Sequence, residues 1–363
     1  MSAVISQRVK PLSGSVWIPG DKSISHRALI IAASAVGESN ITGLLEGLDV
    51  LKTVAALRLL GVEIEKNENG SWSVYGRGVG GLSKPTSVLD MGNSGTGARL
   101  LMGLTAAHSF KAIFSGDTSL SYRPMDRVMA PLRRMGATFD SLNESRLPLT
   151  VYGSDMLRPV TEKLSIASAQ VKSAILLAGL NTLGETTVIE PLPTRDHTEN
   201  MLSAFGARIQ IQTTEQGKSV SLTGQPELSA RKTTIPADPS SAAFPIVAAL
   251  ISPGSTVRLR GICLNPLRTG FLRILGEMGA QINTENHKTL ENEIVGDIFA
   301  EFGDLKGIRI SSESVPSMID EYPILAVAAA CADGETAFEG ISELRLKESD
   351  RVNAIATGLR ACG

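Results

Sequence analysis

A repeated unit of helix, glycine and strand is the feature that most constrains how this chain can fold. Four amphipathic helical segments close on a glycine and run into a β-type stretch, and their ends read Leu59-Leu60-Gly61-Val62, Arg134-Met135-Gly136-Ala137, Ala204-Phe205-Gly206-Ala207 and Glu277-Met278-Gly279-Ala280. Successive glycines are 75, 70 and 73 residues apart, and Arg360-Ala361-Cys362-Gly363 looks like a fifth copy. Glycine suits the left-handed position just past a helix. Self-similarity at a fixed period indicates one supersecondary unit used several times.

A second helix in each unit is built from small apolar residues and has a polar start. The copies begin near Lys22-Ser23, Asn93-Ser94, Ser168-Ala169-Gln170, Pro239-Ser240-Ser241 and Ile319-Asp320-Glu321. A helix that is apolar on nearly every face, as residues 174–179 would be, is buried on all sides. We therefore expect these helices inside, with sheets wrapped around them. Parallel packing would bring their polar starts to one face, which would carry Lys22, Ser23, Asn93, Ser94, Ser168, Gln170, Asp238, Ser240 and Asp320.

An anion is the expected ligand of that face. The run from Gly20 to Arg27 opens the first of these helices, where unpaired backbone N–H groups and the helix dipole favour negative charge. Lys22 and Arg27 add two formal charges there, and Ser23 adds a hydroxyl donor. The alternative is that Asp21 or Ser23 only caps the helix.

Arginines at the starts of the amphipathic helices support the same interpretation. An arginine at a helix N-terminus opposes the dipole, so its presence is better explained by an anionic partner than by stability. Three arginines are placed in this way, namely Arg123, Arg195 and Arg351. Three others lie farther along their helix and are expected to face solvent, namely Arg127, Arg133 and Arg134.

Length and charge narrow the class of protein. A chain of 363 residues favours two domains over one core. Its net charge of −2 and its aromatic content of 4% disfavour nucleic-acid and membrane partners. The three cysteines are widely spaced, which predicts a reducing compartment without a disulfide framework or a zinc site. No signal peptide or membrane span is evident, so a cytoplasmic location is expected.

Five ordered motifs resemble the 5-enolpyruvylshikimate-3-phosphate synthase family. They are Gly20-Asp21-Lys22-Ser23-Ile24-Ser25-His26-Arg27, Gly92-Asn93-Ser94-Gly95-Thr96, Tyr122-Arg123-Pro124-Met125, Ala167-Ser168-Ala169-Gln170-Val171-Lys172-Ser173 and Leu346-Lys347-Glu348-Ser349-Asp350-Arg351. The fourth is similar to the bacterial subgroup often called class II. The resemblance implies an α/β fold, a two-domain inside-out α/β barrel of repeated units with buried helices under outer sheets. Domain one would comprise residues 1–20 plus 237–363, and domain two residues 21–236, with the active site in a cleft that closes on substrate.

The activity implied by the resemblance belongs to the route to chorismate and the aromatic amino acids. The enolpyruvyl group of phosphoenolpyruvate moves to the 5-hydroxyl of shikimate 3-phosphate, and phosphate is released. No metal or organic cofactor is expected, and a monomer is expected. By motif, the residues for shikimate 3-phosphate are Lys22, Ser23, Arg27, Ser168, Gln170, Arg195, Asp320 and Lys347. Those for phosphoenolpyruvate are Lys22, Gly95, Arg123, Gln170, Glu348 and Arg351.

The resemblance also suggests catalytic roles. Asp320 is the candidate base for the hydroxyl, and Glu348 and Lys22 are candidates for moving the proton of the methylene carbon. The alternative for Asp320 and Glu348 is helix capping. Gly95 leaves room beside phosphoenolpyruvate, so sensitivity to the longer inhibitor glyphosate is expected.

Several alternatives stay open at this point. The repeat predicts a strand and a sixth unit after Gly363, the last residue of this sequence. In the family, that part carries an Asp-His-Arg motif and a late lysine. Its absence here would be explained by a partial sequence, by a second polypeptide or by a shortened relative. The chain could bind shikimate 3-phosphate without turnover. The related UDP-N-acetylglucosamine enolpyruvyl transferase uses a loop cysteine near residues 116–123, where this chain has none. RNA 3′-phosphate cyclases are disfavoured by the charge and the few aromatics.

Overall fold

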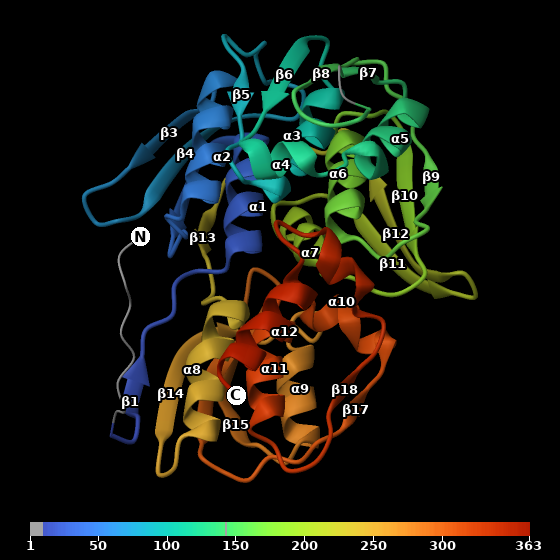
Figure 1. Ribbon diagram of the computed structural model, residues 1–363. Coiled ribbons are helices and arrows are strands. Elements are labelled where there is room, and N and C mark those ends of the chain that lie inside the picture. Colours follow the sequence, from blue (N-terminus) through green and yellow to red (C-terminus); the bar gives the residue numbers. More distant parts are fainter. Residues whose placement is uncertain (1–9, 142–143) are drawn as a thin grey trace.

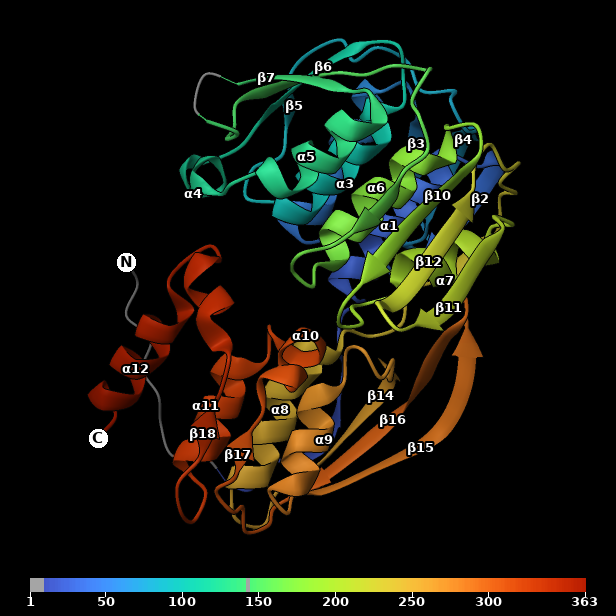
Figure 2. The same ribbon diagram turned by 90° about the vertical axis from the view of Figure 1, so that its right-hand side faces the viewer.

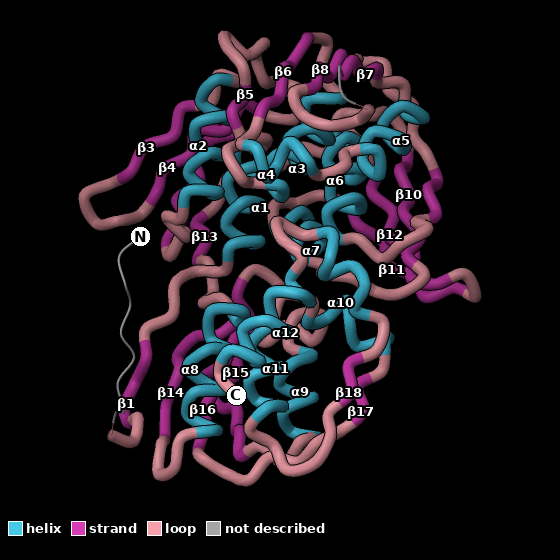
Figure 3. The backbone as a smooth tube through the Cα atoms, viewed as in Figure 1, coloured by secondary structure: helices cyan, strands magenta, loops and turns pink. Residues whose placement is uncertain are grey.

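Two bodies of repeated α/β units lie one above the other (Figure 1). The computed structural model describes residues 10–141 and 144–363. The upper body holds the elements from α1 to β13, and the lower body holds β1 together with those from α8 to α12. Figure 3 shows helices gathered inside each body and strands along its outer side. The α/β fold with buried helices under outer sheets is therefore confirmed.

The small-residue helices form where the sequence predicted them. In the upper body they are α1 (Lys22–Ala33), α3 (Gly95–Ala106) and α6 (Ala169–Leu180), and each is buried over nearly its whole length. In the lower body they are α8 (Pro239–Ile251) and α11 (Tyr322–Ala330), which are buried on part of their surface. Burial on all sides explains why α1, α3 and α6 show no polar face.

The amphipathic helices end at the predicted glycines. They are α2 (Leu48–Leu59), α5 (Asp126–Met135), α7 (His197–Ala204), α9 (Gly270–Glu277) and α12 (Arg351–Ala361). The glycines that follow have positive φ angles of 87°, 116°, 104°, 93° and 94° (Gly61, Gly136, Gly206, Gly279 and Gly363). Each left-handed glycine turns the chain out of the helix, and within the described residues the first four lead into strands.

The sheets repeat one topology. In the described part of the upper body, one sheet has the order β13 (Lys232–Thr234), β2 (Val36–Thr42), β4 (Trp72–Arg77), β3 (Glu63–Lys66). A second has the order β5 (Leu89–Asp90), β6 (Lys111–Ser115), β8 (Leu149–Tyr152), β7 (Thr138–Ser141). A third has the order β9 (Thr161–Lys163), β10 (Glu185–Glu190), β12 (Gly217–Thr223), β11 (Ile209–Thr214). The lower body has β1(Ser13–Val16)-β14(Thr256–Cys263)-β16(Glu293–Glu301)-β15(Gln281–Leu290) and the pair β17(Arg309–Ile310)-β18(Ala337–Phe338). In each case the first pair is parallel, and in the four-stranded sheets the later pairs are antiparallel. The short helices are α4 (Thr118–Tyr122), α10 (Val315–Met318), η1 (Ser312–Ser314) and η2 (Ile341–Leu346).

Two hydrophobic cores match the two bodies. One is formed by residues between Ile24 and Ile235 together with Cys263. The other combines Ile18 with residues between Ala242 and Leu344. The β15–β16 hairpin of the lower body rises to the upper body beside α7 and β11 (Figure 2). The turn of this hairpin contacts the upper body, since Glu291 pairs with Arg231 at 2.9 Å and the Asn292 amide donates to the Asn200 carbonyl at 3.2 Å.

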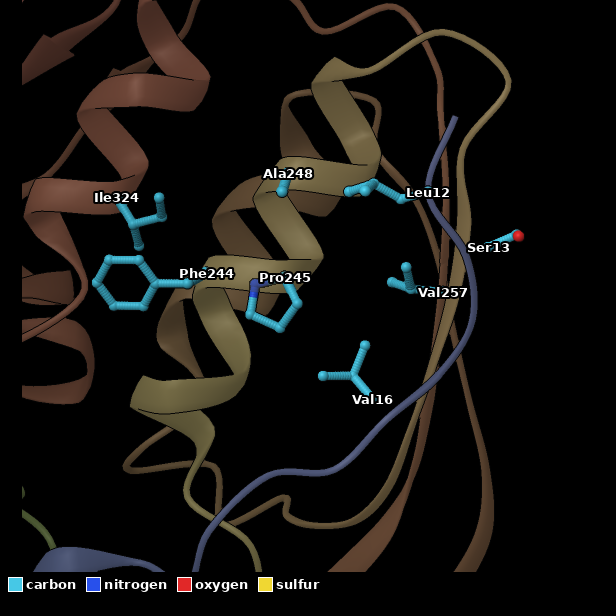
Figure 4. Close-up of a pocket in the computed structure, with 8 residues that line it drawn as sticks. All are labelled: Leu12, Ser13, Val16, Phe244, Pro245, Ala248, Val257 and Ile324. Carbon is cyan, nitrogen blue, oxygen red and sulfur yellow. The ribbon is translucent and has the colours of Figure 1, made fainter. Parts of the chain in front are cut away.

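An apolar groove lies in the lower body between β1, α8 and α11 (Figure 4). Phe244, Pro245 and Ala248 of α8 lie in the middle of the lining, with Ile324 of α11 on one side of this helix and Leu12, just before β1, on the other. Phe244 is 57% exposed. In contrast to α1, α3 and α6, the helices of the lower body therefore keep an uncovered apolar face.

The described residues contain no helix that is both long and apolar enough to cross a membrane. All three cysteines are free thiols, with Cys263 buried and Cys331 and Cys362 exposed.

Candidate active site

Lys22 is the first residue of α1 and is exposed. Asp21 is the N-cap, since its carboxylate accepts from the Ile24 N–H at 2.8 Å. The capping alternative is thus correct for Asp21. The Lys22 ammonium pairs with Asp49 in the first turn of α2, and 46% of its side chain is exposed. Ser23 is half-buried beside it.

Arg27 lies deeper in the same helix and is almost fully buried. Its guanidinium donates to the Thr198 hydroxyl at 2.7 Å, to the Ser173 hydroxyl at 2.8 Å and to the Ser23 carbonyl at 2.9 Å. Burial lowers the pKa of Arg27 to about 10. These hydrogen bonds join α1 to α6 and α7, so in this structure Arg27 fixes the positions of these helices from the buried side of α1.

The starts of α3 and α6 meet through Gln170. Its side-chain oxygen accepts from Arg99 Nη1 at 2.9 Å, and its amide donates to the Thr96 hydroxyl at 2.9 Å. Ser168 caps α6 by accepting from the Val171 N–H at 3.4 Å. The predicted meeting of these two polar helix starts is therefore confirmed.

Gly95 opens α3 between two arginines. A β-carbon at this position would lie 2.8 Å from Arg99 Nη1 and 3.1 Å from Arg123 Nη1. Arg123 also donates to the Asn93 side-chain oxygen at 2.5 Å. The two guanidinium groups therefore lie so close to Gly95 that a methyl group there would displace them.

Arg99 is a site residue that the sequence reasoning missed. Burial is the main cause that lowers the pKa of Arg99 to about 10, and Arg123 and Arg127 add to the effect. A signal was present, because Arg99 follows Gly95 by one turn in a helix that is otherwise small and apolar. A lone arginine of that kind in a buried helix needs a partner.

The lower body contributes Asp320, which ion-pairs with two arginines. Arg195 of the upper body donates to one carboxylate oxygen, and Arg351 donates to the other at 3.1 Å. Burial alone would raise the pKa of Asp320, but Arg195 and Arg268 outweigh it, so that pKa lies far below its usual range. Asp320 is therefore an ionised acceptor between cations.

Glu348 and Lys347 lie beside this cluster. Glu348 accepts from Arg351 Nε at 3.0 Å. Burial works to raise the pKa of Glu348, yet its hydrogen bonds and Arg351 keep it below the usual range. Burial lowers the pKa of Lys347 against the opposing effect of Asp320. A carboxylate and an ammonium group with a lowered pKa are thus neighbours in the chain.

The capping alternative is wrong for both carboxylates. Helix α11 begins at Tyr322 with Glu321 at its N-cap position. Helix α12 begins at Arg351, and its cap is Asp350, which accepts from the Asn353 N–H at 3.0 Å. Asp320 and Glu348 both precede these caps, so their side chains are available to other partners.

Direct contacts join the bodies at this site. The Ser119 hydroxyl donates to the Glu348 carbonyl at 3.3 Å, and Arg127 pairs with Glu343 at 3.2 Å. Arg127 is exposed, as expected, and its guanidinium also pairs across the two bodies. A carboxylate on η2, far away in the sequence, explains its position.

A buried arginine gathers the remaining helix starts. Arg268, in the turn before α9, contacts Asp21 and Asp238 at 3.1 Å each and Glu321 at 3.6 Å. Its Nη2 also donates to the Ser240 hydroxyl at 3.0 Å. The starts of α1, α8 and α11 therefore converge on one cation, as the repeat pattern predicted in general terms.

One cluster has the composition of a metal site. Asp196, His197 and Glu293 place ligand atoms within 4.8 Å of one another. These atoms already have partners, since His197 Nδ1 contacts Glu293 at 2.7 Å and Asn265 donates to Asp196 at 2.7 Å and to Glu293 at 2.8 Å. Hydrogen bonding thus accounts for this cluster, which links α7 to the lower body.

Comparisons with known proteins agree with this geometry. The family model of EPSP synthase (3-phosphoshikimate 1-carboxyvinyltransferase) matches residues 6–363. A 3-phosphoshikimate 1-carboxyvinyltransferase of Paramagnetospirillum magneticum is 58% identical over 99% of this chain and 80% of its own length. One of Parvibaculum lavamentivorans is 56% identical over 100% of this chain and 80% of its own length. The solved EPSP synthase of Acinetobacter baumannii is 46% identical, with a TM-score of 0.85 over 96% of this chain and 78% of that one.

Proposed function

The chain belongs to the EPSP synthase family and is a 3-phosphoshikimate 1-carboxyvinyltransferase, and we propose which of its residues bind each substrate and which move protons. The reaction joins phosphoenolpyruvate to the 5-hydroxyl of shikimate 3-phosphate and releases phosphate. The observation that carries the proposal is the set of cations at helix starts on both sides of Asp320, drawn from both bodies. Both substrates carry several negative charges, which such a site would bind.

Shikimate 3-phosphate occupies the side formed by α1, α6 and the loop before α7. Lys22, Ser23 and Ser168 lie at the exposed ends of these helices and supply donors for its phosphate and hydroxyl groups. The charge of Arg195 acts on Asp21 and Arg27 at the start of α1, and Arg195 gives up part of its pairing with Asp320 to the ligand. Gln170 orients the ring, Lys347 completes the pocket from the lower body, and Arg27 supports α1 from behind.

Phosphoenolpyruvate lies against the start of α3. Gly95 lets it approach the backbone, and Arg123 and Arg351 bind its phosphate and carboxylate from opposite bodies. Arg99 holds Gln170 and extends the positive field. Lys22 and Glu348 lie on either side of the vinyl group.

The chemistry needs one proton to enter and another to leave. Asp320 accepts the proton of the 5-hydroxyl while the oxygen attacks C2 of phosphoenolpyruvate. Lys22, or Glu348 once it has taken up a proton, protonates the methylene carbon. A tetrahedral ketal phosphate results. The same group then removes a methyl proton as the C–O bond to phosphate breaks. Nearby cations stabilise the charge that develops.

Substrate binding prepares Asp320 for this role. Because Arg195 and Arg351 both pair with it, the Asp320 carboxylate is a weak base. Anionic substrates compete for Arg195 and Arg351, so the pKa of Asp320 rises when they bind. This coupling delays base catalysis until both ligands are present.

The domain boundaries fit the same proposal. We place the crossings near Gly20-Asp21 and 236–238, which lie close together because Gly20 pairs with Ala237. Residues 1–20 with 237–363 would then move against residues 21–236. Closure of that kind would exclude water from the reacting groups.

Phosphate release by the purified chain tests the proposal, with each substrate withheld in turn. Release is expected only when both are present, and Lys22→Met is expected to abolish it while leaving the fold intact. The exposed Lys163→Met is the matched control, because Lys163 lies on β9 away from the site. Release without shikimate 3-phosphate, or unchanged release by Lys22→Met, would overturn the assignment of roles. Binding of shikimate 3-phosphate without turnover would instead mark a binding protein.

A further inference from the structure

We propose that Lys172 is a positioning residue that fixes the loop carrying Arg195, and that shikimate 3-phosphate affinity depends on it. This inference rests on the proposed contact between Arg195 and that substrate. Lys172 itself has no exposed surface, so it acts only through other residues.

The end of β10, the loop after it and the start of α7 all contact the Lys172 ammonium. It contacts Glu190 at 2.7 Å, Glu199 at 2.6 Å and the Thr194 carbonyl at 3.4 Å. Glu190 ends β10, Thr194 lies within the loop and Glu199 lies in the first turn of α7. One side chain therefore holds both ends and the middle of the connection between β10 and α7.

The loop is fixed most firmly beside Arg195. The Thr194 hydroxyl donates to Glu190, so this residue is bound through both its side chain and its carbonyl. Arg195 follows directly and reaches Asp320 of the lower body. A shift of the Thr194 backbone would carry the Arg195 guanidinium with it.

The same lysine links this loop to the start of α6. Lys172 belongs to α6 and follows Gln170 by two residues. Its neighbour Ser173 and Thr198 of α7 both bind Arg27. The segments of α1, α6 and the β10–α7 loop that carry the proposed substrate contacts are thus joined by one buried network of hydrogen bonds and ion pairs.

Charge balance shows why a simple packing role is insufficient. The buried Lys172 ammonium contacts two buried carboxylates, Glu190 and Glu199, and the charge of Glu199 also acts on the buried Arg27. A buried ion cluster gives little net stability compared with apolar side chains of the same volume, whereas it fixes geometry closely. A positioning role accounts for four charges at a site that apolar residues could fill.

The main test measures shikimate 3-phosphate binding to the purified chain by calorimetry. Lys172→Met combined with Glu190→Gln removes one charge of each sign, so the net charge of the buried cluster is unchanged. We expect the Kd to rise about tenfold or more, because small misplacements of a binding group cost that much. Val151→Ala in β8 is the control for lost stability, since Val151 is buried in another sheet.

A double-mutant cycle with Arg195→Ala decides between positioning and general destabilisation. If Lys172 acts through Arg195, removing the lysine pair changes the Kd little in the Arg195→Ala background. Equal losses in both backgrounds, or a loss matched by Val151→Ala, would overturn the inference.

The cycle also separates this inference from the proposed function. Should Arg195→Ala alone bind shikimate 3-phosphate as well as the parent chain does, the proposed contact of Arg195 fails. If Arg195→Ala weakens binding and the lysine pair does not, only the positioning role fails.

Discussion

At the residue scale, the site depends on a position without a side chain. Gly95 is buried, and an added methyl group would press on the ends of two arginines. These ends can move by a few tenths of an ångström, so alanine is compatible with folding. The space that remains for a ligand would shrink.

We predict that Gly95→Ala makes the enzyme less sensitive to glyphosate and raises the KM for phosphoenolpyruvate. The longer inhibitor fills more of the space that the methyl group would occupy, so its inhibition constant should rise by the larger factor. Steady-state inhibition assays at fixed shikimate 3-phosphate measure both constants. Equal inhibition of the two proteins would show that glyphosate does not approach Gly95.

A second prediction concerns His26, which is fully buried and accepts or donates one bond to Thr53 at 2.8 Å. Burial, with Lys22 and Arg27, lowers the pKa of His26 to about 3 from 6.5. The unfolded chain therefore binds one more proton between these values. Stability from this residue is present above pH 6.5 and is lost as the pH falls toward 3, by about 1.4 kcal/mol per pH unit.

Urea unfolding of the parent chain and of His26→Gln between pH 6.5 and 4 checks this prediction. The difference in unfolding free energy should change by about 1.4 kcal/mol per pH unit in favour of the glutamine variant. Parallel stability curves would show that His26 does not titrate as described.

Single residues show where sequence reasoning reached its limit. Lys22, Gln170 and Asp320 were found because each lies at a repeated position, the start of a buried helix. Arg99 and Lys172 were missed because their partners lie 71 and up to 27 residues away and become neighbours only in the folded chain. Periodicity locates an element, whereas the partner of a buried charge depends on tertiary packing.

At the element scale, the contact between α3 and α6 sets the spacing of the site. Gly103 of α3 faces Ala174 of α6, and a β-carbon there would lie 2.2 Å from the Ala174 carbonyl oxygen. Backbone atoms cannot move aside as a flexible side chain can. The two helices carry Gly95 and Gln170 at their starts, so their separation determines how these residues meet.

We predict that Gly103→Ala lowers the free energy of unfolding by about 1–3 kcal/mol or more, because it overpacks this helix contact. The control is Gly276→Ala in α9, where a β-carbon meets nothing within 4 Å. That change should stabilise the protein by up to about 1 kcal/mol, since alanine favours helix. Chemical denaturation measures both. A neutral Gly103→Ala would mean that α3 and α6 are less closely packed.

The elements themselves were the most predictable part of the fold. Glycine-closed helices and small-residue helices follow from local rules on backbone conformation and burial, and both patterns were confirmed. The pairing of β1 with β14 could not be derived, because it joins residues more than 240 positions apart. The direct contacts between the bodies were equally hidden in the sequence.

At the scale of the whole molecule, Arg268 links the starts of helices on both sides of the chain crossings. It is 2% exposed and contacts three carboxylates, and their charge raises its pKa against the effect of burial. Loss of this cation would leave Asp21, Asp238 and Glu321 buried with too little positive charge. Such uncompensated charges are strongly destabilising.

We therefore predict that Arg268→Met costs about 3–5 kcal/mol of stability, and that adding Glu321→Gln recovers part of the loss. Arg268→Lys, which keeps one positive charge, should cost less than Arg268→Met. Scanning calorimetry compares the variants. A melting temperature for Arg268→Met within a degree or two of the parent value would exclude this role for the arginine.

The central claim is that helix starts from both bodies form one site for anionic substrates. Hydrogen–deuterium exchange with and without shikimate 3-phosphate tests it most directly. We predict slower exchange at the starts of α1 and α6 and around Arg195 in the upper body, and also around Asp320 and Lys347 in the lower body. Protection confined to one body, or spread without relation to these segments, would contradict the account.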